Sequence, residues 1–88
     1  MNTFSCKLVT PDKVSFDGPV WQVSTKAGYS NFAVRARHAN LLFTAENGTV
    51  EIALTPENRQ KWKVSDFIFK FTNNQCSIIC QTAQAIEN

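Results

Sequence analysis

Apolar and polar residues alternate with period two along most of this chain. In residues 4–8 and 67–71, every second side chain is apolar. Alternation of this kind places one set of side chains on each face of a strand, so it predicts strands rather than helices. The same pattern recurs in five further segments: Val14 to Phe16, Phe32 to Val34, Val50 to Leu54, Trp62 to Val64 and Cys76 to Cys80.

Turn-forming residues separate these segments at close spacing. Six such segments are Pro11-Asp12, Gly18-Pro19, Ala27 to Asn31, Asn47-Gly48, Thr55 to Asn58 and Asn73-Asn74. The order Val20 to Val23 departs from strict alternation, as a β-bulge would make it do. We therefore predict an all-β fold, a two-layer β-sandwich or flattened barrel of about nine or ten short strands.

A helix is not clearly indicated anywhere in the sequence. The one candidate, Ala83 to Asn88, is too short to be stable alone. With 88 residues, no linker and no internal repeat, residues 1–88 are expected to form a single domain. Seven Phe, two Trp and one Tyr in so short a chain predict an aromatic-rich core.

Charge gives little indication of a polyanionic partner. The net charge is +2, and the two signs are interspersed, which is too weak to indicate nucleic acid or an acidic membrane. No signal-peptide core and no apolar stretch of about 20 residues is present. Three cysteines, with Cys76 and Cys80 too far apart along one strand for a disulfide, favour reduced thiols in a cytosolic setting.

The residues that usually carry catalysis or bind metals form no recognisable motif. The glycines are scattered, the cysteines and His38 lack metal-ligand spacing, and nothing marks a Cys-His nucleophile pair. Asp66, just before Phe67, either faces solvent or caps a turn, and a perturbed functional carboxylate is a lesser alternative. We therefore expect no enzymatic activity, no cofactor, no metal and no small-molecule substrate.

Several motifs resemble the N-terminal domain of the epsilon subunit of F-type ATP synthases. The run Thr10-Pro11-Asp12, followed by Phe16-Asp17-Gly18, is similar to the opening of that family. Further matches follow in order: Phe32, Val34, His38, Ala39, Leu41 and Leu42, then Asn47 to Ile52, Val64-Ser65 and Asn74 to Ala83. The resemblance thus spans nearly the whole chain.

Departures from the family pattern concentrate in one loop. Asp66-Phe67 replaces paired glycines, but the other departures lie between Ser30 and Asn40. There, Ser30 and Asn31 stand where the family has a glycine and a glutamate, Arg35-Ala36-Arg37 where it has Leu-Pro-Gly, and Asn40 where it has a proline. We expect this loop to have lost its rigid turn chemistry. The family's regulatory helical hairpin has no counterpart after Asn88, so we expect its inhibitory role to be absent.

The resemblance implies a non-catalytic central-stalk subunit that docks on the gamma subunit and the c-ring and couples rotation to ATP synthesis. It places Tyr29, Ser30 and Asn31 in a loop facing the c-ring and His38 and Phe43 on the gamma side. It also implies a location at the cytoplasmic face of the bacterial inner membrane, peripheral to it through the complex.

Two other interpretations stay open. The altered Ser30 to Asn40 loop favours a divergent paralogue that serves another assembly as a protein-interaction module. Arg35, Arg37 and His38, with Tyr29 and Phe32 upstream, resemble the surface of a nucleic-acid-binding β-barrel, although the small net charge argues against nucleic acid. His38 and Phe43 are also open to a purely structural interpretation, in which one satisfies a turn and the other fills the core.

Overall fold

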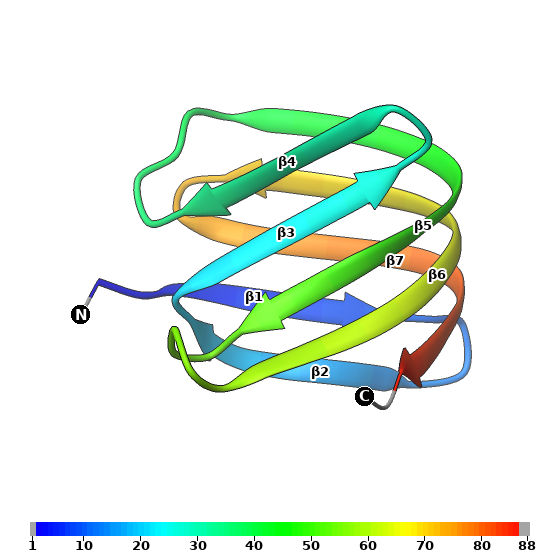
Figure 1. The fold of residues 1–88 in the computed structure, drawn as a ribbon, viewed down its shortest axis with the longest axis horizontal. Helices are drawn as coiled ribbons and strands as arrows, with labels where there is room; N and C mark the ends of the chain where they lie inside the picture. The colour runs from blue at the N-terminus through cyan, green and yellow to red at the C-terminus, as the bar shows by residue number, and fades with distance from the viewer. Residues whose placement is uncertain (1, 87–88) are drawn as a thin grey trace.

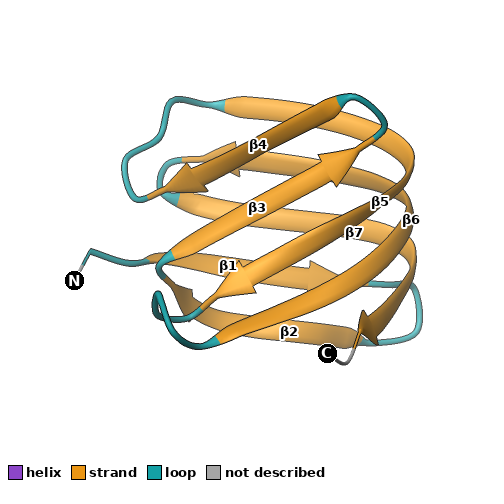
Figure 2. Cartoon of the chain, in the orientation of Figure 1, coloured by secondary structure: helices purple, strands orange, loops and turns teal. Residues whose placement is uncertain are grey.

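The chain folds into one mixed sheet of seven strands that bends over on itself. A computed structural model describes residues 2–86. All regular elements in this part of the chain are strands, joined by short loops (Figure 2). They are β1 (Phe4–Val9), β2 (Val14–Val20), β3 (Gln22–Ala27), β4 (Ser30–Arg35), β5 (Leu41–Ala53), β6 (Arg59–Thr72) and β7 (Gln75–Ile86).

The strand order in the sheet is β2-β1-β7-β6-β5-β3-β4. Neighbouring strands are antiparallel, except that β1 runs parallel to β7, with Cys6 opposite Cys76 and Leu8 opposite Ile78. This pairing places a strand from the start of the chain between its successor β2 and the last strand (Figure 1).

Three long strands, β5, β6 and β7, bend together and divide the sheet into two packed layers (Figure 1). The first layer holds β2, β1 and residues 75–80, 67–72 and 41–45. The second holds β4, β3 and residues 47–53, 59–65 and 82–86. The expected two-layer sandwich is therefore confirmed, and it is not a closed barrel.

The bend has a simple signature in the sequence: successive inward-facing residues are three apart there instead of two. In β6 the buried residues Val64 and Phe67 flank it. The same step runs from Cys80 to Ala83 in β7 and from Ala45 to Gly48 in β5, and these residues are direct neighbours across the strands. Each of the three strands thus has one extra residue, and the three extra residues lie side by side across the sheet. As a result, the inward-facing side chains before and after the bend point to the same core.

Two residues make this bend sterically possible. Asp66 adopts a φ of 46°, a left-handed conformation that Asp tolerates better than most residues. Gly48 lies where the backbone of β5 crosses close to β3, because a Cβ at this position would meet the Lys26 carbonyl oxygen at 2.8 Å. The glycine therefore serves a close approach between strands.

The core between the layers is rich in phenylalanine, as expected. Phe67, Phe69 and Phe71 are almost completely buried. Phe32 of the second layer meets Phe69 of the first edge to face, with ring centroids 5.2 Å apart, a geometry that aromatic pairs prefer. The rest of the core consists of aliphatic side chains, Phe4 and the three cysteines, with Thr25 as its one buried polar residue in the part of the chain described.

The cysteines are free and buried, as expected. The sequence did not indicate that Cys6 and Cys76 would face each other across β1 and β7. A hydrogen bond with Cys6, together with burial and the electrostatic interaction with Cys6, raises the pKa of the Cys76 thiol. Burial also raises the pKa of Cys80. Cys76 and Cys80 are thus kept protonated inside the sandwich.

The sandwich has seven strands and not the expected nine or ten, because expected short strands are continuous through the bend: residues 62–64 and 67–71, for example, both belong to β6. The Asn47-Gly48 turn does not exist, since both residues lie inside β5. Gly18-Pro19 belongs to β2, where an edge strand tolerates proline. Residues 83–86 of the helix candidate extend β7, and residues 87 and 88 lie outside the described part.

The remaining turns are confirmed. Asn73 and Asn74 both have positive φ, 50° and 60°, as a two-residue hairpin requires. The chain also reverses at Pro11-Asp12 and at Thr55 to Asn58. At Val20 to Val23 the irregular pattern marks the boundary between β2 and β3 at Trp21.

Candidate docking surface

The outer surface of the first layer carries an apolar face. Ile68 and Ile79 are direct partners on β6 and β7, and Ile79 is in turn paired with Val9 on β1. Leu42 lies beside them on β5, two positions from the partner of Ile68. Leu42, Ile68 and Ile79 are 68 %, 43 % and 52 % exposed. Adjacent exposed aliphatic side chains of this kind typically mark an interaction site.

This apolar face is hollowed on either side of Lys70. One depression of about 290 Å³ is lined by Leu42, Lys70 and their neighbours at residues 40, 41 and 72. A second of about 270 Å³ lies between Lys70 and Ile79. The face thus offers ridges and depressions that a complementary protein surface could fill.

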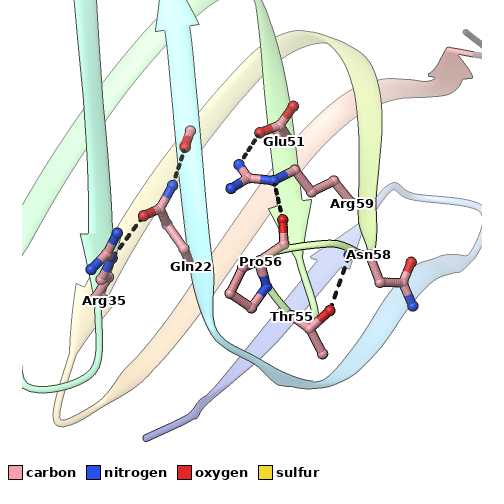
Figure 3. Close-up of polar contacts among 8 residues, drawn as sticks. Gln22, Arg35, Glu51, Thr55, Pro56, Asn58 and Arg59 are labelled. Atoms are coloured by element: carbon pink, nitrogen blue, oxygen red, sulfur yellow. Dashed lines mark hydrogen bonds and ion pairs between the residues drawn. The ribbon is translucent and has the colours of Figure 1, made fainter. Parts of the chain in front are cut away.

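The outer surface of the second layer is different in character. Six charged side chains occupy its outward positions: Lys26, Arg35, Glu51, Arg59, Lys61 and Lys63. Arg59 and Glu51 form an ion pair at 2.8 Å, drawn in Figure 3. The outer surface of the first layer also carries Lys7, Asp17 and Lys70, but it has a cluster of adjacent exposed aliphatic side chains. We call it the apolar face and the outer surface of the second layer the charged face, and the apolar face is the candidate docking surface.

The three residues expected to face the c-ring stay together at one end of the molecule. Gly28 and Tyr29 form the β3–β4 turn, in which Gly28 has a φ of 60°. Tyr29 projects fully into solvent. Ser30 and Asn31 are exposed but belong to the start of β4, so the loop is shorter than expected.

His38 lies at the opposite end, in the loop between β4 and β5 (Figure 1). The ring is exposed and packs edge to face against Phe71, with centroids 5.8 Å apart. Its Nδ1 lies 2.7 Å from the Ala39 carbonyl oxygen. His38 is thus available to a partner while it also covers the rim of the core.

Phe43 points inward from β5 and is only partly exposed. It meets Phe32 edge to face at 5.1 Å and Phe67 at 6.1 Å. The structure does not bring Phe43 and His38 into one patch, since the ring of Phe43 packs between the layers.

The loop that contains His38 keeps a defined turn, contrary to expectation. The backbone N–H of His38 donates a hydrogen bond to the Arg35 carbonyl oxygen at 3.1 Å. Arg37 has a φ of 70°, a conformation that glycine adopts readily. The Asn74 side chain accepts a hydrogen bond from the Arg37 N–H at 2.7 Å. Hydrogen bonds thus hold the loop in place, where the family uses glycine and proline.

Sequence reasoning missed Ile68 and Ile79 as surface residues. A signal was present: both occupy positions between buried residues of an alternating strand, where a polar residue is the usual choice. Because Phe67 and Phe69 face the core, Ile68 has to face outward.

The described residues contain no cluster of titratable side chains of the kind that forms a metal site. Among residues 2–86, no group of three or more His, Cys, Asp or Glu side chains could hold a metal ion. The same range contains no helix able to cross a bilayer.

Curated relatives with detectable similarity are ATP synthase epsilon chains. The chain is 29 % identical over 87 residues to that of Clostridium botulinum strain Eklund 17B, covering 99 % of this chain and 65 % of the relative. It is 24 % identical to that of Chlorobium limicola, covering 89 % of both. The chain thus spans about two thirds of the Clostridium relative and most of the Chlorobium one.

Solved structures share the fold. A chain of the Euglena gracilis mitochondrial ATP synthase, in its OSCP/F1/c-ring assembly, superposes with a TM-score of 0.85 at 14 % identity, over 94 % of this chain and 53 % of that one. A chain of the Tetrahymena thermophila central stalk and c-ring gives 0.74 at 18 %, over 91 % and 64 %. The model of the ATP synthase delta/epsilon chain beta-sandwich domain matches residues 3–86. The chain therefore belongs to the ATP synthase delta/epsilon chain family, through its beta-sandwich domain.

Proposed function

We propose that this chain is a non-catalytic central-stalk subunit of an F-type ATP synthase, and that it docks through the apolar face on the gamma subunit. Its role is to link the gamma subunit to the c-ring, so that proton-driven rotation reaches the site of ATP synthesis. Family membership supports this role. In such a complex the chain lies at the cytoplasmic face of the bacterial inner membrane, held there by its partners.

The observation that carries the proposal is the contrast between the two outer surfaces. Leu42, Ile68 and Ile79 leave adjacent apolar area in water on the first layer, whereas six charged side chains lie on the outer surface of the second. Burying such area favours association by about 25 cal/mol per Å² before the costs of binding are subtracted. A subunit that has to stay attached to a turning shaft requires a stable interface, and an apolar centre with a polar rim provides it.

The opposite ends of β4 suit two separate contacts. A strand of six residues separates the Tyr29 turn from the loop of His38, roughly 20 Å at the usual rise per residue. We assign Tyr29, Ser30 and Asn31 to the c-ring and His38 to the rim of the gamma interface. Phe43 packs between the layers, so its part in this contact is structural.

The test is binding to the gamma subunit of the same organism, measured by isothermal titration calorimetry. Ile68→Glu introduces a charge at the centre of the apolar face, and burying it without a partner is costly. We expect the dissociation constant to rise at least tenfold, which corresponds to about 1.4 kcal/mol.

Ala33→Glu is the matched control, because Ala33 is exposed on β4, on the outer surface of the second layer. It should leave gamma binding unchanged. Circular dichroism should show that both variants keep the fold. Wild-type protein that does not bind gamma would refute the proposal and favour the divergent paralogue, whereas equal loss in both variants would refute docking by the apolar face.

A further inference from the structure

The charged face ends in a cluster built around Trp21, at the junction of β2 and β3. The guanidinium of Arg35 lies over the indole, 4.2 Å from the ring centroid. Its Nε donates to Gln22 Oε1 at 2.8 Å, and the Gln22 amide in turn donates to the Ser24 hydroxyl at 3.1 Å. Figure 3 shows this chain of contacts running across β4 and β3. Arg35 is therefore held in place by stacking and by a hydrogen bond.

Stacking leaves the in-plane donors of a guanidinium available. Only Nε of Arg35 is occupied, and among residues 2–86 its two terminal nitrogens have no hydrogen-bond partner. These nitrogens form a fork that matches the two oxygens of a carboxylate. Because the side chain is already ordered, little rotamer entropy remains to be lost when a ligand binds.

A hollow lies beside this fork. It measures about 280 Å³ and is lined by Asn2, Trp21, Arg35 and Ala36, with no acidic residue among them. A second arginine, Arg59, approaches the same indole at 5.8 Å, but its ion pair with Glu51 balances its charge. Among residues 2–86, Arg35 is therefore the one positively charged residue that lines the hollow, and it has no ion-pair partner, which suits a ligand with a single negative charge.

We propose that this hollow, with the fixed fork of Arg35 as its anchor, binds the carboxylate of an Asp or Glu side chain on a partner protein. A carboxylate carries one charge and two coplanar oxygens, whereas a phosphate dianion would leave a charge unbalanced. The site is separate from the apolar face and gives the charged face a contact of its own.

The experiment is a two-dimensional NMR titration of the 88-residue protein with acetate, inorganic phosphate or chloride at matched ionic strength. Acetate should produce saturable shifts at the Trp21 indole N–H and at the amides of Ala36 and Asn2. In Arg35→Gln the dissociation constant for acetate should rise at least tenfold. Arg35→Lys should lose most of the affinity too, because it keeps the charge but not the fork.

Lys63→Gln is the matched control, since it removes the same charge from the same face but does not line the hollow. It should leave acetate binding within about twofold, a difference near the 0.4 kcal/mol that such a ratio represents. Shifts from acetate no larger than those from chloride would overturn the proposal. So would equal weakening by Arg35→Gln and Lys63→Gln, or tighter binding of phosphate than of acetate. Binding of these variants to the gamma subunit is measured in a separate experiment. The carboxylate site and the docking of the gamma subunit on the apolar face can therefore be refuted independently.

Discussion

Replacing Gly48 by alanine should destabilise the sandwich strongly. The added methyl group would lie 2.8 Å from the Lys26 carbonyl oxygen, 3.0 Å from Ala27 Cβ and 3.1 Å from Phe67 Cε1. The first neighbour is backbone and the second is a Cβ fixed to it, so a rotamer change cannot relieve either contact. Relief requires β3 and β5 to move apart by several tenths of an ångström along a hydrogen-bonded ladder.

Overpacking a well-packed core typically costs 1–3 kcal/mol. Three close contacts at one methyl group, two of them rigid, place Gly48→Ala near the upper end, at about 3 kcal/mol. For a domain of this size, each kcal/mol lowers the melting temperature by about 4–8 °C. We therefore expect a loss on the order of 12–24 °C, a large part of the total stability of a small domain.

Urea unfolding followed by circular dichroism measures this change as a lower midpoint at constant slope. Gly18→Ala is the control, because its added Cβ would meet nothing closer than Phe16 Cζ at 3.8 Å. That variant should be neutral or gain about 0.4–1 kcal/mol from the stiffer unfolded chain. If the two variants have equal stability, the close approach of β5 to β3 does not constrain Gly48 and the reasoning is wrong.

Three further predictions concern strain, buried polarity and pH. Asp66→Val should cost about 1–3 kcal/mol in urea unfolding, because a β-branched residue is strained at a φ of 46°, while Asp66→Gly should keep wild-type stability; equal values would refute this. Thr25→Val should raise the free energy of unfolding by about 1 kcal/mol in thermal melts, because the buried Thr25 hydroxyl has no hydrogen-bond partner within residues 2–86; a loss of stability would contradict this. The raised pKa of Cys76 means that only the unfolded thiol ionises as the pH passes its ordinary value of 9.0. Stability should therefore fall above that pH, by up to about 1.4 kcal/mol per pH unit for this thiol. In Cys76→Val the fall measured by urea unfolding should be shallower by that amount, and an identical slope would contradict the assignment.

Alternation alone was enough to predict which side chains build the core within each short segment. Every second residue of 67–71 and 76–80, starting with Phe67 and Cys76, faces inward as the pattern requires, because a strand with one buried face has no other register that hides its apolar side. It was not enough to connect the segments. At Asn47-Gly48 the local preference for a turn is overridden, because the strand has to pass close to β3 and continue through the bend. The three-residue spacing of inward-facing residues, such as Val64 to Phe67, is visible in the sequence. It identifies a bend only when the neighbouring strands are known to carry the same spacing in the same row.

The candidate site was predicted in part. The exposed turn at Tyr29 follows from local chemistry, since Gly28 permits the reversal. The apolar face does not, because Ile68, Ile79 and Leu42 come together only once the order of β5, β6 and β7 is fixed. The stack of Arg35 on Trp21 likewise joins residues from different strands through a pairing that no local pattern specifies.

The parallel pairing of β1 with β7 sets a condition on how the protein can be made. While the chain is being synthesised, Cys6 and Leu8 have β2 as their only neighbouring strand until residues 75–80 have left the ribosome. An isolated two-stranded hairpin is at best marginally stable in water. The first layer therefore closes only after residues 75–80 have emerged, so a nascent chain stalled before β7 would expose its phenylalanines to the cell's chaperones.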